Sequence, residues 1–196
     1  MYAGRWTTVL PHTRVRALPG WLLNSFAVLE YRLQVSTIAY AERILRGALH
    51  ATEEQIQHRL YTRLIRQTLF ERGDSTPVYL AVIDEAVLRR SIGGVAVMRE
   101  QLLHLRSMMD RSRVMIQIIP AGAGNTTGMT GGFAIAELPG GQRWAYLDGA
   151  ISGQVTEHAE DVSVVSVMHD ALRAWALPQQ WSGDLVERLV EDVYQQ

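Results

Sequence analysis

The amino-acid sequence predicts an α/β or α+β domain in which roughly six or seven helices cover a small sheet of about four strands. Short, continuous apolar runs at residues 78–83 and 114–119 are typical of strands that are covered on both faces. Longer segments around them repeat apolar residues every three to four positions, as amphipathic helices do. The chain has 196 residues, 47% of them hydrophobic and 20% charged, which is enough to bury a sizeable core.

The N-terminal half is predicted to be mostly helical. A short β-like run at residues 6–10 and a Pro19-Gly20 turn precede a helix predicted over 21–33, and a second helix follows over about 40–50. A third helix begins at Thr52, where Gln55 completes a capping box. Apolar residues at helical spacing form the inner stripes of the first and third helices: Leu22, Phe26, Leu29 and Leu33, then Ile56, Leu60 and Leu64.

The C-terminal half alternates strands and helices. A helix is predicted after Gly93-Gly94, and two strands over 132–138 and 142–147 form a hairpin. Two helices close the chain, over about 162–176 and 184–194, and Ser182 is the predicted cap of the second. The helix after Gly93-Gly94 is expected to turn five residues inward: Val95, Met98, Leu102, Leu105 and Met109. The helix over about 162–176 is expected to turn four inward: Val165, Met168, Leu172 and Trp175.

Composition excludes several kinds of chemistry. The chain has no Cys, so a thiol nucleophile, a disulfide and a thiolate metal site are ruled out. All nineteen basic residues are Arg, which excludes Schiff-base chemistry and a P-loop lysine. A net charge of −1 gives no general attraction to nucleic acid. No apolar run approaches the length of a membrane span and no leader is visible, so export and membrane insertion are not expected.

Two segments invite a ligand-binding interpretation and also have a simpler one. The Gly-rich loop over 121–132 is one residue too long for a dinucleotide fingerprint and leads into a strand, so it is predicted to connect two strands. It could also close over a pocket. Arg59, Arg63 and Arg66 share one helical face, which suits either an anionic ligand or pairing with neighbouring Glu side chains.

Carboxylates near two strand ends are the candidate reactive groups. Asp84-Glu85 and Arg89 lie where a strand enters a helix, a position that suits either the helix dipole or a ligand at a sheet edge. Trp144, Tyr146 and Asp148 alternate along the last predicted strand and therefore point the same way, as edge packing or as one wall of a pocket. The six His residues show no metal-ligand spacing, so no metal site is expected.

Seven short motifs occur in an order and spacing that resemble one family. They are Tyr40-Ala41, Arg63-x-x-Arg66-Gln67, Asp84-Glu85-Ala86-x-Leu88-Arg89-Arg90, Gly93-Gly94, Met98-x-x-Gln101-Leu102, Gln117-x-x-Pro120, and the Gly-rich loop followed by Ala176-Leu177 and Ser182. Over about three quarters of its length, the chain resembles the antitoxin-like sensor domain of actinobacterial transcription regulators of the xenobiotic-response-element (XRE) type. The resemblance implies a cytoplasmic protein that senses a small molecule or a small partner protein. The absence of Cys, Lys, a nucleotide motif and metal-ligand spacing favours a protein without a cofactor.

The sequence departs from that family's pattern in its N-terminal part. In similar regulators a helix-turn-helix precedes the sensor domain, and the residues before Trp21 are too few for one. We therefore expect residues 1–39 to form a rebuilt extension, with Trp6, Trp21 and Phe26, that packs on a core domain over 40–196. Asn125 stands where relatives often carry His.

These observations favour a stand-alone module that binds a small molecule or a regulator partner, without DNA binding of its own. The alternative is a cofactor-free enzyme of specialised metabolism, such as a cyclase, isomerase or dehydratase, built on the same pocket. Pairing with a second copy is left open. The expected catalytic residues are Glu85, Tyr146 and Asp148, and the expected ligand contacts are Trp21, Phe26, Arg63, Arg66, Arg89, Asn125 and Trp144.

Overall fold

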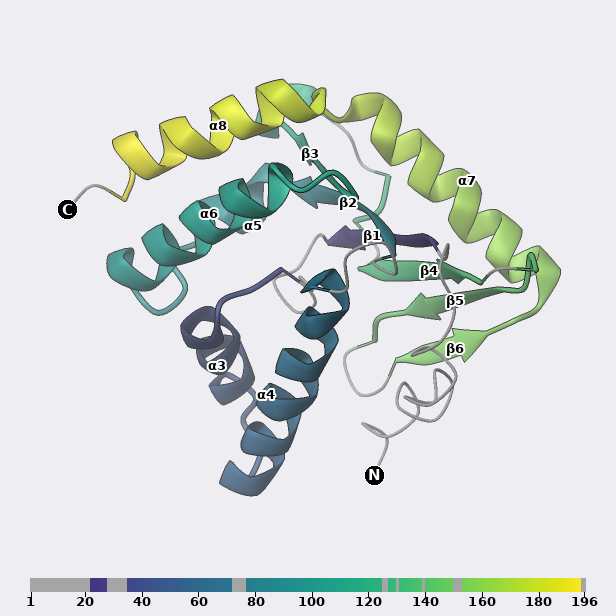
Figure 1. The fold of residues 1–196 in the computed structure, drawn as a ribbon, viewed down its shortest axis with the longest axis horizontal. Coiled ribbons are helices and arrows are strands. Elements are labelled where there is room, and N and C mark those ends of the chain that lie inside the picture. Colours follow the sequence, from purple (N-terminus) through teal and green to yellow (C-terminus); the bar gives the residue numbers. More distant parts are fainter. Residues whose placement is uncertain are drawn as a thin grey trace.

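The protein is built around one mixed β-sheet with helices on both faces (Figure 1). The computed structural model describes residues 22–27, 35–71, 77–124, 127–129, 131–138, 140–149 and 153–194; for β1 and for Arg66 and Leu69, only the backbone is described. Within these residues, the sheet has six strands in the order β3-β2-β1-β4-β5-β6. This α+β architecture confirms the predicted fold class, with more strands than the four expected.

The strand directions bring several loops to one edge of the sheet. The strands are β1 (Leu22–Ala27), β2 (Val78–Asp84), β3 (Val114–Ile119), β4 (Phe133–Glu137), β5 (Arg143–Leu147) and β6 (Gln154–Thr156). β1 and β3 each pair in parallel with β2, whereas β4 pairs antiparallel with β1, β5 with β4, and β6 with β5. The ends of β2, β3 and β5 and the beginnings of β4 and β6 therefore lie at the same edge, called here the carboxyl edge.

Two hydrophobic clusters cover the two faces of the sheet. The α-helices are α3 (Ile38–Arg46), α4 (Glu53–Gln67), α5 (Glu85–Arg89), α6 (Val95–Met109), α7 (Ala159–Trp175) and α8 (Gln179–Asp192), with 3-10 turns η2 (Thr68–Glu71) and η4 (Ala121–Ala123). On one face, Tyr79, Ile83 and Ile116 pack against α6 and α8. On the other, Phe133 and Ile135 pack against α7, which runs past β4 and β5 (Figure 1).

Helices α3 and α4 form a hairpin that projects from the sheet (Figure 1). A small core of its own, made of Ala41, Leu45, Ile56 and Leu60, holds its two helices together. The predicted capping box begins α4: the Thr52 hydroxyl accepts from the Gln55 amide at 3.2 Å, and the Gln55 side chain accepts from the Thr52 amide at 3.1 Å. The predicted inward position of Leu64 is wrong, since its side chain is exposed.

The helix predicted over 21–33 is wrong within the described residues, because Leu22–Ala27 is a strand in the middle of the sheet. Residues four apart share a face in a strand as well as in a helix, so the spacing of Leu22 and Phe26 did not discriminate between them. β6 was not predicted, since three residues carry almost no periodic signal. The predicted run at 6–10, and the Trp6 and Trp21 side chains, lie outside the described residues.

Ser182 does not cap α8 but lies inside it, where its side chain is fully buried. Its hydroxyl accepts from the Ile118 amide at 3.0 Å and donates to the Leu177 carbonyl at 3.2 Å. Because the Leu177 amide also donates to the Ile118 carbonyl at 2.9 Å, the α7–α8 connection closes the free edge of β3.

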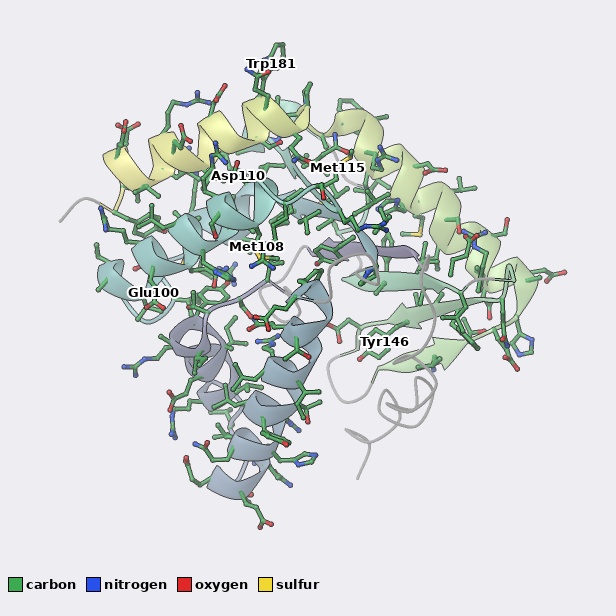
Figure 2. All side chains as sticks on the ribbon, in the orientation of Figure 1. Glu100, Met108, Asp110, Met115, Tyr146 and Trp181 are labelled. Atoms are coloured by element: carbon green, nitrogen blue, oxygen red, sulfur yellow. The ribbon has the colours of Figure 1, made fainter. Side chains whose placement is uncertain are left out.

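The inward prediction for Trp175 is also wrong, since 51% of its surface is exposed. The inward stripe of α7 runs through Val162, Val165, His169 and Leu172, and Trp175 falls to one side of it. Trp181 of α8 likewise points away from the body (Figure 2). No helix in the described part of the chain is both long and apolar enough to cross a bilayer.

Candidate ligand-binding site

At the carboxyl edge, Glu85 ties the start of α5 to the loop after β3. Its side chain is buried, one oxygen accepts from the Arg89 guanidinium at 2.6 Å, and the other accepts from the Ala121 amide at 2.7 Å. The preceding Asp84 caps α5 by accepting from the Ala86 amide at 2.8 Å. Both Glu85 oxygens are thus occupied within the protein, which favours a structural role for the Glu85–Arg89 pair.

Glutamines from the recognised motifs also bind main-chain groups. The buried Gln101 side chain donates to the Val35 carbonyl at 3.0 Å and accepts from the Thr37 amide at 2.7 Å. Gln67 donates to the Ser36 carbonyl, and Gln117 donates to the Leu177 carbonyl at 3.0 Å. These side chains join segments that are far apart in sequence, so their first role is to hold the fold together.

Tyr146 and Asp148 lie together at the end of β5, as their alternation predicted. Tyr146 is buried, and its hydroxyl donates to the Asp148 carboxylate at 3.4 Å. Trp144, further back on the strand, donates from its indole nitrogen to Glu157 at 3.1 Å. Gly153 packs against the Tyr146 ring so closely that a Cβ atom there would overlap the phenol.

Beside this pair, a hollow of about 800 Å³ opens between the N-terminal half of α7 and the β4–β6 end of the sheet. We refer to it below as the α7 hollow. The sheet supplies one wall, α7 supplies the other, and glycines form part of the rim. Its lining consists of Gly131, Gly132, Phe133, Leu147, Asp148, Gly153, Gln154, Val155, Thr156, Asp161, Val164, Val165 and Met168.

The polar groups of the α7 hollow are mainly acidic. Asp148 lines it directly after β5, and Asp161 lines it from the first turn of α7. The Thr156 hydroxyl donates to Asp161 at 2.8 Å and accepts from the His158 amide at 3.2 Å, so it connects β6 to the start of the helix. The apolar part of the lining comes from side chains that also belong to the core under α7, such as Phe133 and Val165.

His169 is buried next to the α7 hollow. Its ring meets the Phe133 ring edge-on, with centroids 6.4 Å apart, and only 3% of its surface is exposed. Burial, assisted by the positive charge of Arg173, lowers the pKa of His169 to about 4. The ring is therefore neutral at pH 7, and its 3.9 Å approach to Asp170 is not an ion pair there. Its Nε2 atom has no hydrogen-bond partner among the described residues.

The structure thus places the predicted site residues in separate locations. Asp148 lines the α7 hollow, whereas Tyr146 and Trp144 do not line it, because Ala145 and Leu147 occupy the α7 face of β5. Glu85 and Arg89 lie three strands away, roughly 14 Å along the carboxyl edge. Arg63 lies on α4, in the projecting hairpin. Trp21, Asn125 and the Phe26 and Arg66 side chains lie outside what the structure describes, so their roles stay predictions.

Sequence reasoning missed most of the lining, above all Gln154, Thr156, Asp161, Val164 and Met168. For α7, the sequence offered one signal of a binding surface, which is apolar residues away from the buried stripe of the helix: Val164 and Val167 are both largely exposed. Among the described residues, no group of three His, Asp or Glu side chains could hold a metal ion. What the α7 hollow can offer is apolar contact together with carboxylate hydrogen-bond acceptors.

The comparisons with known proteins reach the level of a family. Residues 27–188 match the model of a family described as "Domain of unknown function (DUF5753)", which is most of the chain. No curated protein and no solved structure matches the sequence.

Proposed function

Because the chain belongs to the DUF5753 family, whose function is unknown, we propose a role from its geometry: it is a small-molecule-binding module related to the sensor domains of XRE-type regulators. The observation that carries this proposal is the α7 hollow. Its volume, about 800 Å³, lies within the range of roughly 300–1,000 Å³ that is usual for small-molecule sites. Mixed apolar and polar lining, held on a sheet and a long helix, suits recognition of a small organic molecule.

The motif residues that carry the family resemblance already hold the fold together, which favours the α7 hollow as the ligand site. Glu85, Gln101 and Gln117 hold main-chain groups, so a ligand that engaged them would first have to displace those bonds. Lining residues of the α7 hollow also form hydrogen bonds, since Asp148 accepts from Tyr146 and Asp161 accepts from Thr156, but these bonds join residues close in sequence. A ligand that bound there would leave the bonds of Glu85, Gln101 and Gln117 intact.

The connection from α7 to α8 offers a route for a signal. Arg173, near the end of α7, donates to Gln117 at 3.2 Å, and the following Leu177 is held on β3 by Ser182 and Gln117. A molecule wedged under the N-terminal half of α7 would tilt this helix against a connection that is fixed at its other end. The shift would reach α8, which packs on the opposite face of the sheet.

A pair of variants on α7 tests the proposal. Val164 lines the α7 hollow and is 61% exposed, whereas Val167, one turn further, is 66% exposed and does not line it. Val164→Trp should fill the site, and Val167→Trp is the matched control; neither change should alter stability by more than about 0.5 kcal/mol. We expect fragments that contact the wild type, detected by saturation-transfer NMR, to lose binding only in Val164→Trp. Equal binding to both variants would refute this site.

One observation favours a second function, that of a cofactor-free enzyme. Asp148, which lines the α7 hollow, accepts a hydrogen bond from the Tyr146 hydroxyl and could take a proton from a bound substrate. Asp148→Asn keeps the shape and an acceptor oxygen but cannot act as a base. With metabolite extracts as substrate, catalysis predicts turnover by the wild type that Asp148→Asn loses, while a pure binding module shows no turnover in either.

A further inference from the structure

Helix α7 is apolar on two opposite faces, and the sheet covers one of them. The covered face consists of Val162, Val165, His169 and Leu172. The opposite face, called here the outer α7 face, consists of Val164, Val167, Ala171, Ala174 and Trp175. Val164, Val167 and Trp175 are exposed over 61%, 66% and 51% of their surface. A helix with a single partner carries one apolar stripe, so the second stripe indicates a second partner.

The outer α7 face has the spacing of a helix–helix contact. Val164, Val167, Ala171 and Ala174 follow one another at intervals of three, four and three positions, and Trp175 lies next to the last of them. Residues at these intervals form a row along one side of a helix, and such rows are the surfaces through which helices pack together. The partner is therefore expected to present a helix of its own.

The charges at the two ends of α7 favour a second copy of this helix in antiparallel orientation. The first turn carries Glu160 and Asp161, whereas the last turn carries Arg173. Antiparallel pairing places the acidic turn of each copy beside the basic turn of the other, and parallel pairing would place acid against acid. A lipid surface fits less well, because helices that lie on membranes carry mainly basic residues on their polar side.

The sizes of the side chains favour the same arrangement. The larger residues, Val164 and Val167, lie in the N-terminal half of the row, and the smaller ones, Ala171 and Ala174, lie in the C-terminal half. In an antiparallel pair, Val164 lies opposite the partner's Ala174, and Val167 lies opposite the partner's Ala171. Large side chains then meet small ones along the whole contact, as close packing requires.

We infer that two copies of this protein pair through their outer α7 faces, with the two α7 helices antiparallel. This inference goes beyond the proposed ligand binding, because the α7 hollow is formed within one chain; Val164 belongs to both surfaces. A contact made by one helix from each copy is small for a protein interface, so the pairing should be reversible and should depend on concentration.

Sedimentation velocity of the full chain without ligand measures the pairing. The average mass should rise toward twice that of one chain as the protein concentration increases from about 1 µM to about 1 mM. Val167→Asp places a charge in the middle of the contact and should weaken pairing about tenfold or more. The matched control is Leu49→Asp, because Leu49 is an apolar side chain that is 93% exposed, between α3 and α4. It should leave the pairing unchanged.

Disulfide cross-linking tests the orientation, and the natural chain has no Cys that would interfere. A mixture of Val164→Cys and Ala174→Cys should form a linked dimer on oxidation, because these positions face each other in an antiparallel pair. Neither variant alone should do so, since each position then lies about 15 Å along the helix axis from its own counterpart. A disulfide joins Cα atoms only about 4.4–6.8 Å apart. Both positions are exposed, so the variants should fold normally.

Three results would overturn this inference. They are a chain that stays monomeric up to about 1 mM, a dimer that Val167→Asp weakens no more than Leu49→Asp does, and efficient cross-linking of Val164→Cys with itself, which shows parallel pairing. The fragment-binding test of the α7 hollow is a separate measurement. The pairing and the proposed function can therefore fail independently of each other.

Discussion

Replacing Gln101 with leucine removes a side chain that joins α6 to the segment before α3. Gln101 is 1% exposed, and it satisfies the Val35 carbonyl and the Thr37 amide, more than sixty positions away. Leucine has a similar volume but no polar atoms, so both main-chain groups would lose their partners. A buried unsatisfied group costs roughly 1–3 kcal/mol, and Val35 is buried while Thr37 is half-buried, so we expect Gln101→Leu to lower the free energy of unfolding by about 3 kcal/mol.

Urea denaturation followed by circular dichroism measures this loss. The matched control is Gln57→Leu on α4, because the Gln57 side chain is exposed and its bond among the described residues is to Glu53, which is also exposed; we expect it to change stability by less than about 0.5 kcal/mol. Hydrogen exchange should also show early loss of protection in α3, the helix that Gln101 anchors. A loss below about 1 kcal/mol in Gln101→Leu, or equal losses in both variants, would refute the assigned role of this side chain.

Three further predictions concern stability. The pKa of His169 is about 4 in the folded protein and near 6.5 in the unfolded chain, so the free energy of unfolding should be full above pH 6.5 and fall by up to about 3 kcal/mol as the pH drops to 4. His169→Gln should flatten this pH dependence in urea titrations, and an unchanged slope would contradict the prediction. Ser182→Ala leaves the Ile118 amide without its acceptor and should cost about 1–3 kcal/mol in thermal unfolding, against none for the exposed Ser163→Ala. Gly153→Ala should cost about 1–3 kcal/mol through its clash with Tyr146, and a smaller residue at 146 should relieve it; no rescue would argue against that contact.

Sequence reasoning succeeded for elements whose local signal is unambiguous. Continuous apolar runs predicted β2 and β3, because strands covered on both faces admit few polar residues. The Thr52–Gln55 capping box predicted the start of α4, since its two hydrogen bonds depend only on residues three apart. β1 was missed because its identity comes from its neighbours β2 and β4, which are distant in sequence.

The site could be predicted only in part. Alternation along a strand is local, so the proximity of Tyr146 and Asp148 followed from the sequence. The α7 hollow depends instead on how α7 packs across β4, β5 and the three-residue β6, and no periodicity shows that. Glu85 was a reasonable catalytic candidate by its position at a strand end, but only the structure shows that both of its oxygens are already bound.

Chemical-shift mapping of a bound probe tests the central claim most directly. With a fragment that binds the wild type and not Val164→Trp, the amides of Leu147, of residues 153–156 and of residues 161–168 should shift together, while those of the α3–α4 hairpin stay in place. Shifts confined to Arg63 on α4, or to Glu85 and Arg89 on α5, would show that the ligand site lies elsewhere.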